Sequence, residues 1–226
     1  MMPHPVIVPE IFALRPDFTV LRLAVAGGAN RAGDAASSGP LAEAVAGLDP
    51  AAPWAEAHLA ARRDTCRGFG AKPGRPPGSA EALRKRTLRD GGLPPANAVP
   101  VGGEDAGACA GAPTLCRATG NGAFDSMAKG VPVTAPPEAG AVIRCDGQGV
   151  TCRRRNRRQG RGRQLTKASR ALWFVPERLE PMPIAALTEA GRALAHGLRV
   201  LAPRAVVTAA ILDQASPEGR PLALEG

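Results

Sequence analysis

The residues of this chain that can do chemistry gather in a few short stretches, and the richest of them is basic. The segment TCRRRNRRQGRGRQLTKASR spans residues 151–170, and from Arg153 to Arg170 it holds nine of the 29 Lys and Arg residues and no acidic residue. Guanidinium groups donate several hydrogen bonds to phosphate oxygens, so this pattern favours a polyanion as partner. A solvated basic loop is the alternative, because the segment lacks aromatic residues that would stack on bases.

Two glycine-containing stretches are the next candidates. Gly102-Gly103-Glu104-Asp105 can present carboxylates on a tight loop, although a surface turn has the same composition. The second stretch is FGAKPGRPPG at 69–78, which contains Lys72. Its Gly and Pro residues predict a loop. It resembles a phosphate-binding loop only loosely, because the spacing of a P-loop is absent and no GxGxxG motif lies at a strand-to-helix turn.

The cysteines do not indicate a metal site. Their number is odd, and two pairs are separated by seven positions, whereas paired zinc ligands usually lie two to four apart; the five are Cys66, Cys109, Cys116, Cys145 and Cys152. The three histidines are scattered and single out no Cys/His nucleophile. We therefore expect reduced, buried or half-buried thiols in a cytoplasmic protein, with no metal and no cofactor.

Composition excludes other classes. The chain has 226 residues, 44% of them hydrophobic, and a formal net charge of +9 that comes from the basic stretch, since the remaining residues balance. No apolar run approaches the roughly 18–20 residues of a membrane helix, and the first residues do not resemble a secretory signal. These features predict a single domain over 1–226 that does not enter a membrane.

The elements that must position these stretches are both helical and extended. Apolar, β-branched runs predict strands, a turn at Asp146-Gly147 predicts a hairpin, and apolar residues three and four apart predict helices. The expected strands are 18–26, 142–145, 150–152, 171–175 and 205–212, and the expected helices are 54–63, 79–90 and 184–201, with a further helical piece around 41–48. The mixture predicts an α+β (mixed α/β) fold.

The helical faces are predicted from the same spacing. Trp54 and His58 share one face of the first helix, and Leu83 and Leu88 should face inward on the second. The inward stripe of the last helix should consist of Ile184, Leu187, Ala190, Leu194, Leu198 and Leu201.

Four motifs occur together in order: FGAKP, GGLPPAN, PVGGED and CRRRNRRQG, within residues 62–99, 100–107 and 151–179. In this combination they resemble the free-standing B3/B4 domain proteins, which are similar to the B3/B4 module of the bacterial phenylalanyl-tRNA synthetase β subunit. The resemblance covers roughly residues 54–180, with weaker support from the strand and helix on either side.

The resemblance implies a domain of mixed β-sheets flanked by helices around a central pocket, in which water hydrolyses a mischarged aminoacyl-tRNA ester. It implies tRNA or aminoacyl-tRNA as partner and no ligase activity. The matching pocket residues are Gly102, Gly103, Glu104, Asn156, Arg158 and Gln159, of which Glu104 and Asn156 are the catalytic candidates. The matching tRNA contacts are Lys72, Arg75, Arg153, Arg154, Arg161 and Arg163.

The chain departs from that pattern in two ways. A segment similar to VDLYNAVSLRY is missing between Val99 and Pro100, and the family's Tyr and two Trp positions hold Cys66, Arg155 and Arg157. These departures leave two alternatives to hydrolysis open: an RNA binder without catalysis, and a degenerate remnant of the family. The amino acid, the tRNA and the oligomeric state are not determined by these residues.

Overall fold

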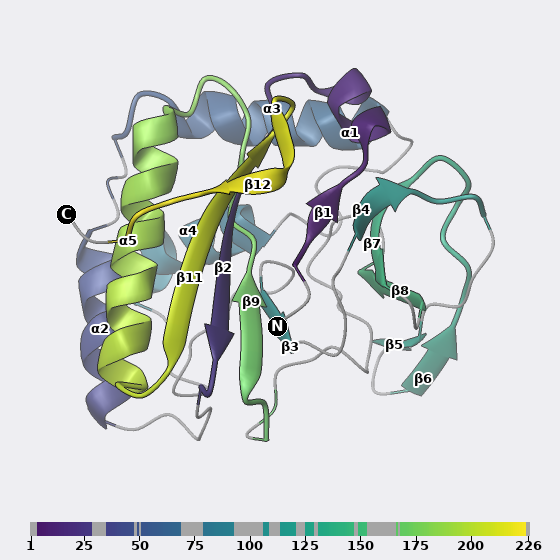
Figure 1. Ribbon diagram of the computed structural model, residues 1–226. Helices are drawn as coiled ribbons and strands as arrows, with labels where there is room; N and C mark the ends of the chain where they lie inside the picture. The colour runs from purple at the N-terminus through teal and green to yellow at the C-terminus, as the bar shows by residue number, and fades with distance from the viewer. Residues whose placement is uncertain are drawn as a thin grey trace.

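The computed structural model describes residues 4–28, 35–47, 49, 51–68, 79–92, 106–108, 114–120, 125–128, 131–146, 149–152, 166 and 168–224. Within these residues the chain combines helices with mixed and antiparallel sheets, which confirms the α+β class. A central sheet separates a helical layer from a second, smaller sheet (Figure 1).

The central sheet is built around β2 (Thr19–Ala26), whose sequence TVLRLAVA is apolar on both faces except at Arg22. Continuous apolar runs of this kind are typical of a strand that is covered on both sides. The strand order is β12-β11-β2-β9-β3, and β10 also pairs with β2. The partners are β3 (Ala106–Ala108), β9 (Ala171–Phe174), β10 (Glu177–Arg178), β11 (Val206–Asp213) and β12 (Ser216–Pro221).

β9 and β10 lie along β2 in one continuous antiparallel register. Phe174 is opposite Leu23 and Glu177 is opposite Val20, so the two intervening residues keep the spacing. Pro176 has no N–H to donate, which interrupts the ladder, but its carbonyl still accepts a hydrogen bond of 2.9 Å from the Leu21 amide. Side chains therefore continue to alternate between the two faces of the sheet from β9 to Glu177.

Helix α5 (Ile184–Leu201) covers one face of this sheet, with its predicted bounds confirmed (Figure 1). Its buried residues are Leu187, Gly191, Ala195, Leu198 and Leu201. The predicted inward stripe was wrong at Ile184 and Ala190, which are both exposed. The helix packs closely through its small residues, because Gly191 lies directly over Leu21 of β2.

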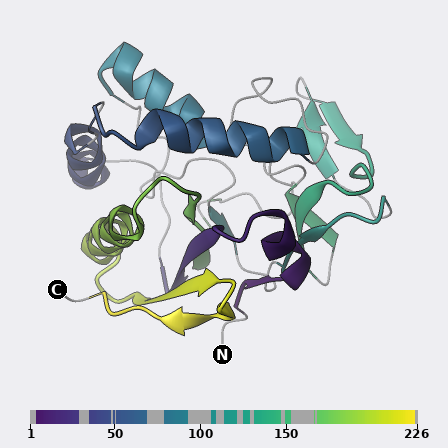
Figure 2. The ribbon, with the colours of Figure 1, turned by 90° about the horizontal axis from the view of Figure 1, so that it is seen from above.

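The N-terminal segment and the second sheet lie on the other face (Figure 2). The second sheet has the order β1-β4-β7-β8, in which only β1 and β4 are parallel. Its strands are β1 (Val6–Ile7), β4 (Thr114–Arg117), β7 (Val142–Asp146) and β8 (Gly149–Cys152), and α1 (Pro9–Leu14) follows β1. Ile11, Phe12, Leu115 and Val142 from this layer share one core with Trp173 of the central sheet.

Three further helices and a hairpin complete the described residues. They are α2 (Ala35–Ala46), α3 (Ala55–Gly68), α4 (Ser79–Asp90), and the strands β5 (Asp125–Ala128) and β6 (Val131–Thr134). Ion pairs join α3 to α4, with Arg63 Nη2 3.0 Å from Glu81 Oε1 and Arg84 Nη1 2.7 Å from Glu56 Oε1. The prediction that Leu88 faces inward was wrong, because it is 49% exposed on α4.

We predict that Gly191→Ala destabilises the protein by about 1–3 kcal/mol, although alanine is the better helix former. A Cβ at Gly191 would lie 2.0 Å from Leu21 Cδ2, so the fully buried Leu21 side chain, or the elements that carry the two residues, must shift. Urea unfolding measures the change. Gly39→Ala on α2 is the matched control, since nothing lies within 4 Å of a Cβ there and its effect should be neutral or stabilising. Equal effects of the two substitutions would contradict the close packing of α5.

Candidate functional site

Every site residue predicted from the sequence lies outside the described residues. This applies to Gly102, Gly103, Glu104, Asn156, Arg158, Gln159, Lys72, Arg75, Arg153, Arg154, Arg161 and Arg163. Their roles stay predictions. The structure does place the described residues that bound two of their segments, and a series of contacts connects them.

The bounding residues belong to different sheets. Ala106, which directly follows the PVGGED motif, begins β3 and lies opposite Phe174 of β9. Cys152, which directly precedes the basic segment, ends β8 and lies opposite Arg144 of β7. Glu177 follows Phe174 by three residues, and its carboxylate binds the Arg144 side chain. Strand pairing and one ion pair thus connect the end of one motif to the start of the other.

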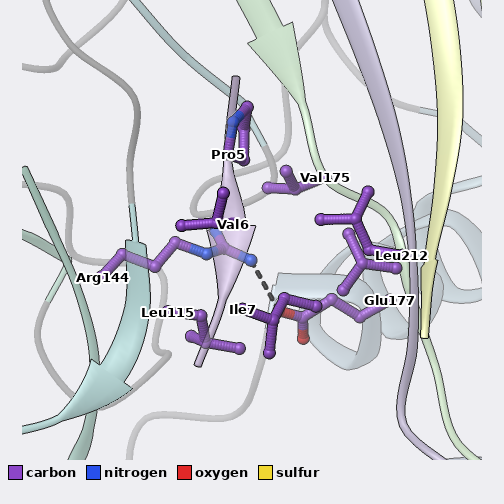
Figure 3. A pocket seen from close by; sticks show the side chains of 9 residues that line it. Pro5, Val6, Ile7, Leu115, Arg144, Val175, Glu177 and Leu212 are labelled. Atoms are coloured by element: carbon purple, nitrogen blue, oxygen red, sulfur yellow. Dashed lines mark hydrogen bonds and ion pairs between the residues drawn. The ribbon is translucent and has the colours of Figure 1, made fainter. Parts of the chain in front are cut away.

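That ion pair is part of a buried cluster of three charged side chains. Glu177 Oε1 lies 2.6 Å from Arg144 Nη2, and Glu177 Oε2 lies 3.4 Å from Arg62 Nη2 (Figure 3 draws the first contact). The side chains of Glu177 and Arg144 are 2% and 6% exposed, and that of Arg62 is 15% exposed. The cluster therefore joins β10 of the central sheet, β7 of the second sheet and helix α3.

The alternation of strand residues explains why these side chains meet. Trp173, Val175 and Glu177 share one face of their strand, and the first two belong to the core between the sheets. Val142 belongs to the same core, and Arg144 shares its face on β7. The two charged residues are thus directed into an apolar core, where their pairing offsets the cost of burying each charge.

A small cavity adjoins the cluster. It has a volume of about 20 Å³, which suits about one water molecule. Its lining is apolar apart from the ion pair (Figure 3) and consists of Pro5, Val6, Ile7, Val20, Leu115, Arg144, Val175, Glu177 and Leu212. Ligand pockets usually measure about 300–1,000 Å³, so this cavity does not admit an amino acid or a nucleotide.

The two guanidinium groups of the cluster hold the carboxylate in place. Each oxygen of the Glu177 carboxylate faces one guanidinium, so the carboxylate is held as an acceptor. A carboxylate bound in this way does not serve as a general base, because protonation would disrupt both contacts. We conclude that the cluster positions the segments around it rather than reacting.

A buried histidine fixes the helix that supplies Arg62. His58 lies one turn before Arg62 on α3, and its Nδ1 donates a hydrogen bond of 3.0 Å to the carbonyl oxygen of Leu179, just after β10. Its ring meets Trp54 edge-on, at a centroid distance of 6.2 Å. Burial lowers the pKa of His58 below its ordinary value, partly offset by the hydrogen bond to Leu179. The neutral ring thus fastens α3 to the strand that carries Glu177.

Sequence reasoning assigned no role to Arg62, Arg144 or Glu177. A signal was present for two of them, because Arg144 interrupts the apolar run VIRC and Glu177 follows the buried strand ALWFV after one proline. Charged residues inside such runs are buried only when they are paired. The pairing itself spans 33 residues and could not be predicted from spacing.

Metal-binding clusters and membrane-spanning helices are both absent from the described ranges. No group of three or more His, Cys, Asp and Glu residues in them is arranged to hold a metal ion. None of the helices found there combines the length and apolar character needed to cross a bilayer.

Glu177→Ala should lower the free energy of unfolding by about 3–5 kcal/mol, because it removes the carboxylate that binds the buried guanidinium of Arg144 and the half-buried one of Arg62. Chemical denaturation measures the change. The matched control is Glu56→Ala, which removes a carboxylate whose side chain is 69% exposed and should cost less than about 1 kcal/mol. If the two variants are equally stable, the cluster does not join the layers.

We also predict a pH dependence that His58 causes. A group whose pKa is lowered on folding stabilises the protein above its unfolded pKa, and this contribution is lost as the pH falls below about 6.5. The free energy of unfolding should therefore decrease between about pH 7 and pH 5, and this slope should be smaller in His58→Gln. An unchanged slope in the variant would contradict the assignment.

Comparison of the chain with models of known protein families finds none that matches, and comparison with curated proteins finds no match either.

Proposed function

We propose that the chain is a tRNA-binding domain of the B3/B4 kind that hydrolyses the ester of an aminoacyl-tRNA and has no ligase activity. The proposal places it in the cytoplasm, where thiols stay reduced. It rests on the four motifs of the sequence and on the concentration of positive charge in one segment.

The occurrence of the four motifs in order along one chain is the observation that carries the proposal. Hydrolysis of a bound ester needs a group that orients water and groups that hold the nucleic acid, and these must lie close together. PVGGED supplies the first through Glu104, and the basic segment supplies the second. Ala106 and Cys152, which bound the two segments, are connected through Phe174, Glu177 and Arg144.

The distribution of charge supports RNA as the partner. Acidic side chains bind the arginines of α3 and α4, as in the pairs Arg63–Glu81, Arg84–Glu56 and Arg86–Asp90. The positive excess of the chain belongs instead to the segment that begins at Arg153. Binding of several phosphates by one such segment releases counterions and gives an affinity that falls steeply with salt.

The reaction needs no protein nucleophile. Water, oriented by Glu104, attacks the carbonyl carbon of the ester, and the bond between that carbon and the ribose oxygen of the tRNA breaks. The amino acid leaves with the hydroxyl from water, and the ribose oxygen takes up the proton. Asn156 and Arg158 hold the ester and the tRNA end in this scheme, so catalysis rests on positioning and electrostatics.

The test is a panel of mischarged tRNAs incubated with the full chain, with deacylation and binding measured separately. Glu104→Ala should slow deacylation by about 100-fold or more while leaving tRNA binding intact. Arg158→Ala should weaken binding and reduce the salt slope by about one unit. Arg192→Ala removes the same charge from the exposed surface of α5 and should change neither.

The outcomes separate the alternatives. Salt-dependent binding of tRNA without hydrolysis of any ester would overturn the catalytic part and leave a non-catalytic RNA binder. Absence of both activities in a cooperatively folded protein would overturn the proposal and leave a remnant of the family. Equal effects of Arg158→Ala and Arg192→Ala would show that the basic segment is not the contact surface.

A further inference from the structure

Two thiols face each other on the outer side of the second sheet. Cys116 lies on β4 and Cys145 on the neighbouring antiparallel strand β7, where Cys116 is opposite Ile143 and Thr114 is opposite Cys145. The two cysteines are therefore diagonal neighbours on one face. They pack beside Ile143 and Val150, on the side of β7 opposite to Arg144.

The sulfur atoms are in contact. Cys116 Sγ lies 3.0 Å from Cys145 Sγ, and Cys145 Sγ lies 3.7 Å from the carbonyl oxygen of Thr114, to which it donates. Since the Cys145 proton is directed to Thr114, the Cys116 thiol is the donor between the two sulfurs. Both residues are free thiols and both are half-buried. The pairing of β4 with β7 thus holds two reduced sulfur atoms in direct contact.

We propose that Cys116 and Cys145 form a dithiol that exchanges with low-molecular-weight disulfides, of which oxidised glutathione is the chemical type, and closes a reversible disulfide between β4 and β7. The inference does not depend on the proposed RNA function. A disulfide needs side chains on the same face at short range, and neighbouring strands supply both conditions here.

The exchange proceeds in two balanced steps. The Cys145 thiolate attacks one sulfur of oxidised glutathione, which forms a mixed disulfide and releases one glutathione thiolate. The Cys116 thiolate then attacks Cys145 Sγ, which forms the Sγ–Sγ bond and releases the second. The two thiol protons pass to the two glutathione thiolates, so the protein loses two electrons and glutathione gains them.

The order of attack follows from the surroundings of Cys116. Its thiol is half-buried and its sulfur lies in contact with Cys145 Sγ. Burial, and then the contact with Cys145, raise the pKa of Cys116 to about 12, so this thiol reacts second. Deprotonation of Cys116 limits ring closure, and the rate should increase with pH.

The other described cysteines are excluded by position. Cys152 lies opposite Arg144 in the pairing of β7 with β8, so it belongs to the inner face of the sheet. Cys66 lies on α3, within its last turn. These two residues are therefore matched controls that carry the same functional group in a different place.

The test uses the full chain in glutathione buffers of increasing oxidised fraction. Remaining thiols are alkylated, the protein is digested, and the cysteine peptides are quantified by mass spectrometry. The expected result is one peptide pair linked through Cys116 and Cys145, which disappears on addition of dithiothreitol. The oxidised protein should also unfold at a temperature about 5–10 °C higher, because the link constrains the unfolded chain.

Substitutions distinguish a specific pair from general oxidation. In Cys66→Ala and Cys152→Ala the Cys116–Cys145 link should form as in the unsubstituted protein, and in Cys116→Ala the glutathione adduct on Cys145 should accumulate. Glutathione adducts on both cysteines of the unsubstituted protein without a link between them would overturn the proposal. A link that requires urea would also overturn it, because the folded sheet would then not bring the sulfurs together.

Discussion

A carboxylate buried between two guanidinium groups joins the central sheet, the second sheet and helix α3. Removing these charges from water costs several kcal/mol for each ion, and this cost is offset only when the partners lie in contact. Glu177 comes from the central sheet, Arg144 from the second sheet and Arg62 from helix α3. These three elements are therefore held in one relative position, because separating them would break ion pairs inside a largely apolar core.

The register of β9 and β10 against β2 determines where Glu177 lies. Pro176 interrupts the ladder between β9 and β10 but keeps the spacing, so Glu177 lies on the same face as Trp173 and Val175. On β7 the two faces differ in chemistry, since Arg144 lies toward the central sheet and Cys145 toward the outer cluster. A disulfide at Cys145 would consequently form next to the residue that fixes the layers, without competing for its contacts.

Charged residues are arranged differently on helices α3 and α4 and in the basic segment. The arginines of α3 and α4 bind glutamate and aspartate in surface pairs. Each pair contributes little to stability, but the acidic side chain neutralises the positive charge of its arginine. The positive excess is left to the residues that follow Cys152, where phosphate would be bound. This division is the physical reason why the proposed function places phosphate contacts on that segment rather than on the helices.

Periodicity along the chain was sufficient for several elements, including the bounds of α5, the central strand β2 and the β7–β8 hairpin, because these depend on neighbours that are near in sequence. It was insufficient for helix faces, as Ala190 and Leu88 show, because which side of a helix is covered depends on the elements packed against it and not on its own spacing alone. It was also insufficient for β12, whose sequence SPEGRP carries no strand pattern and which forms as an edge strand against β11. The sequence alone determined the class of fold, the motifs and the place of the positive charge. Only the tertiary structure decided that Glu177 binds Arg144 and that Cys116 meets Cys145. Both contacts join residues about 30 positions apart, the first through the packing of two sheets and the second through the pairing of β4 with β7, and local spacing encodes neither.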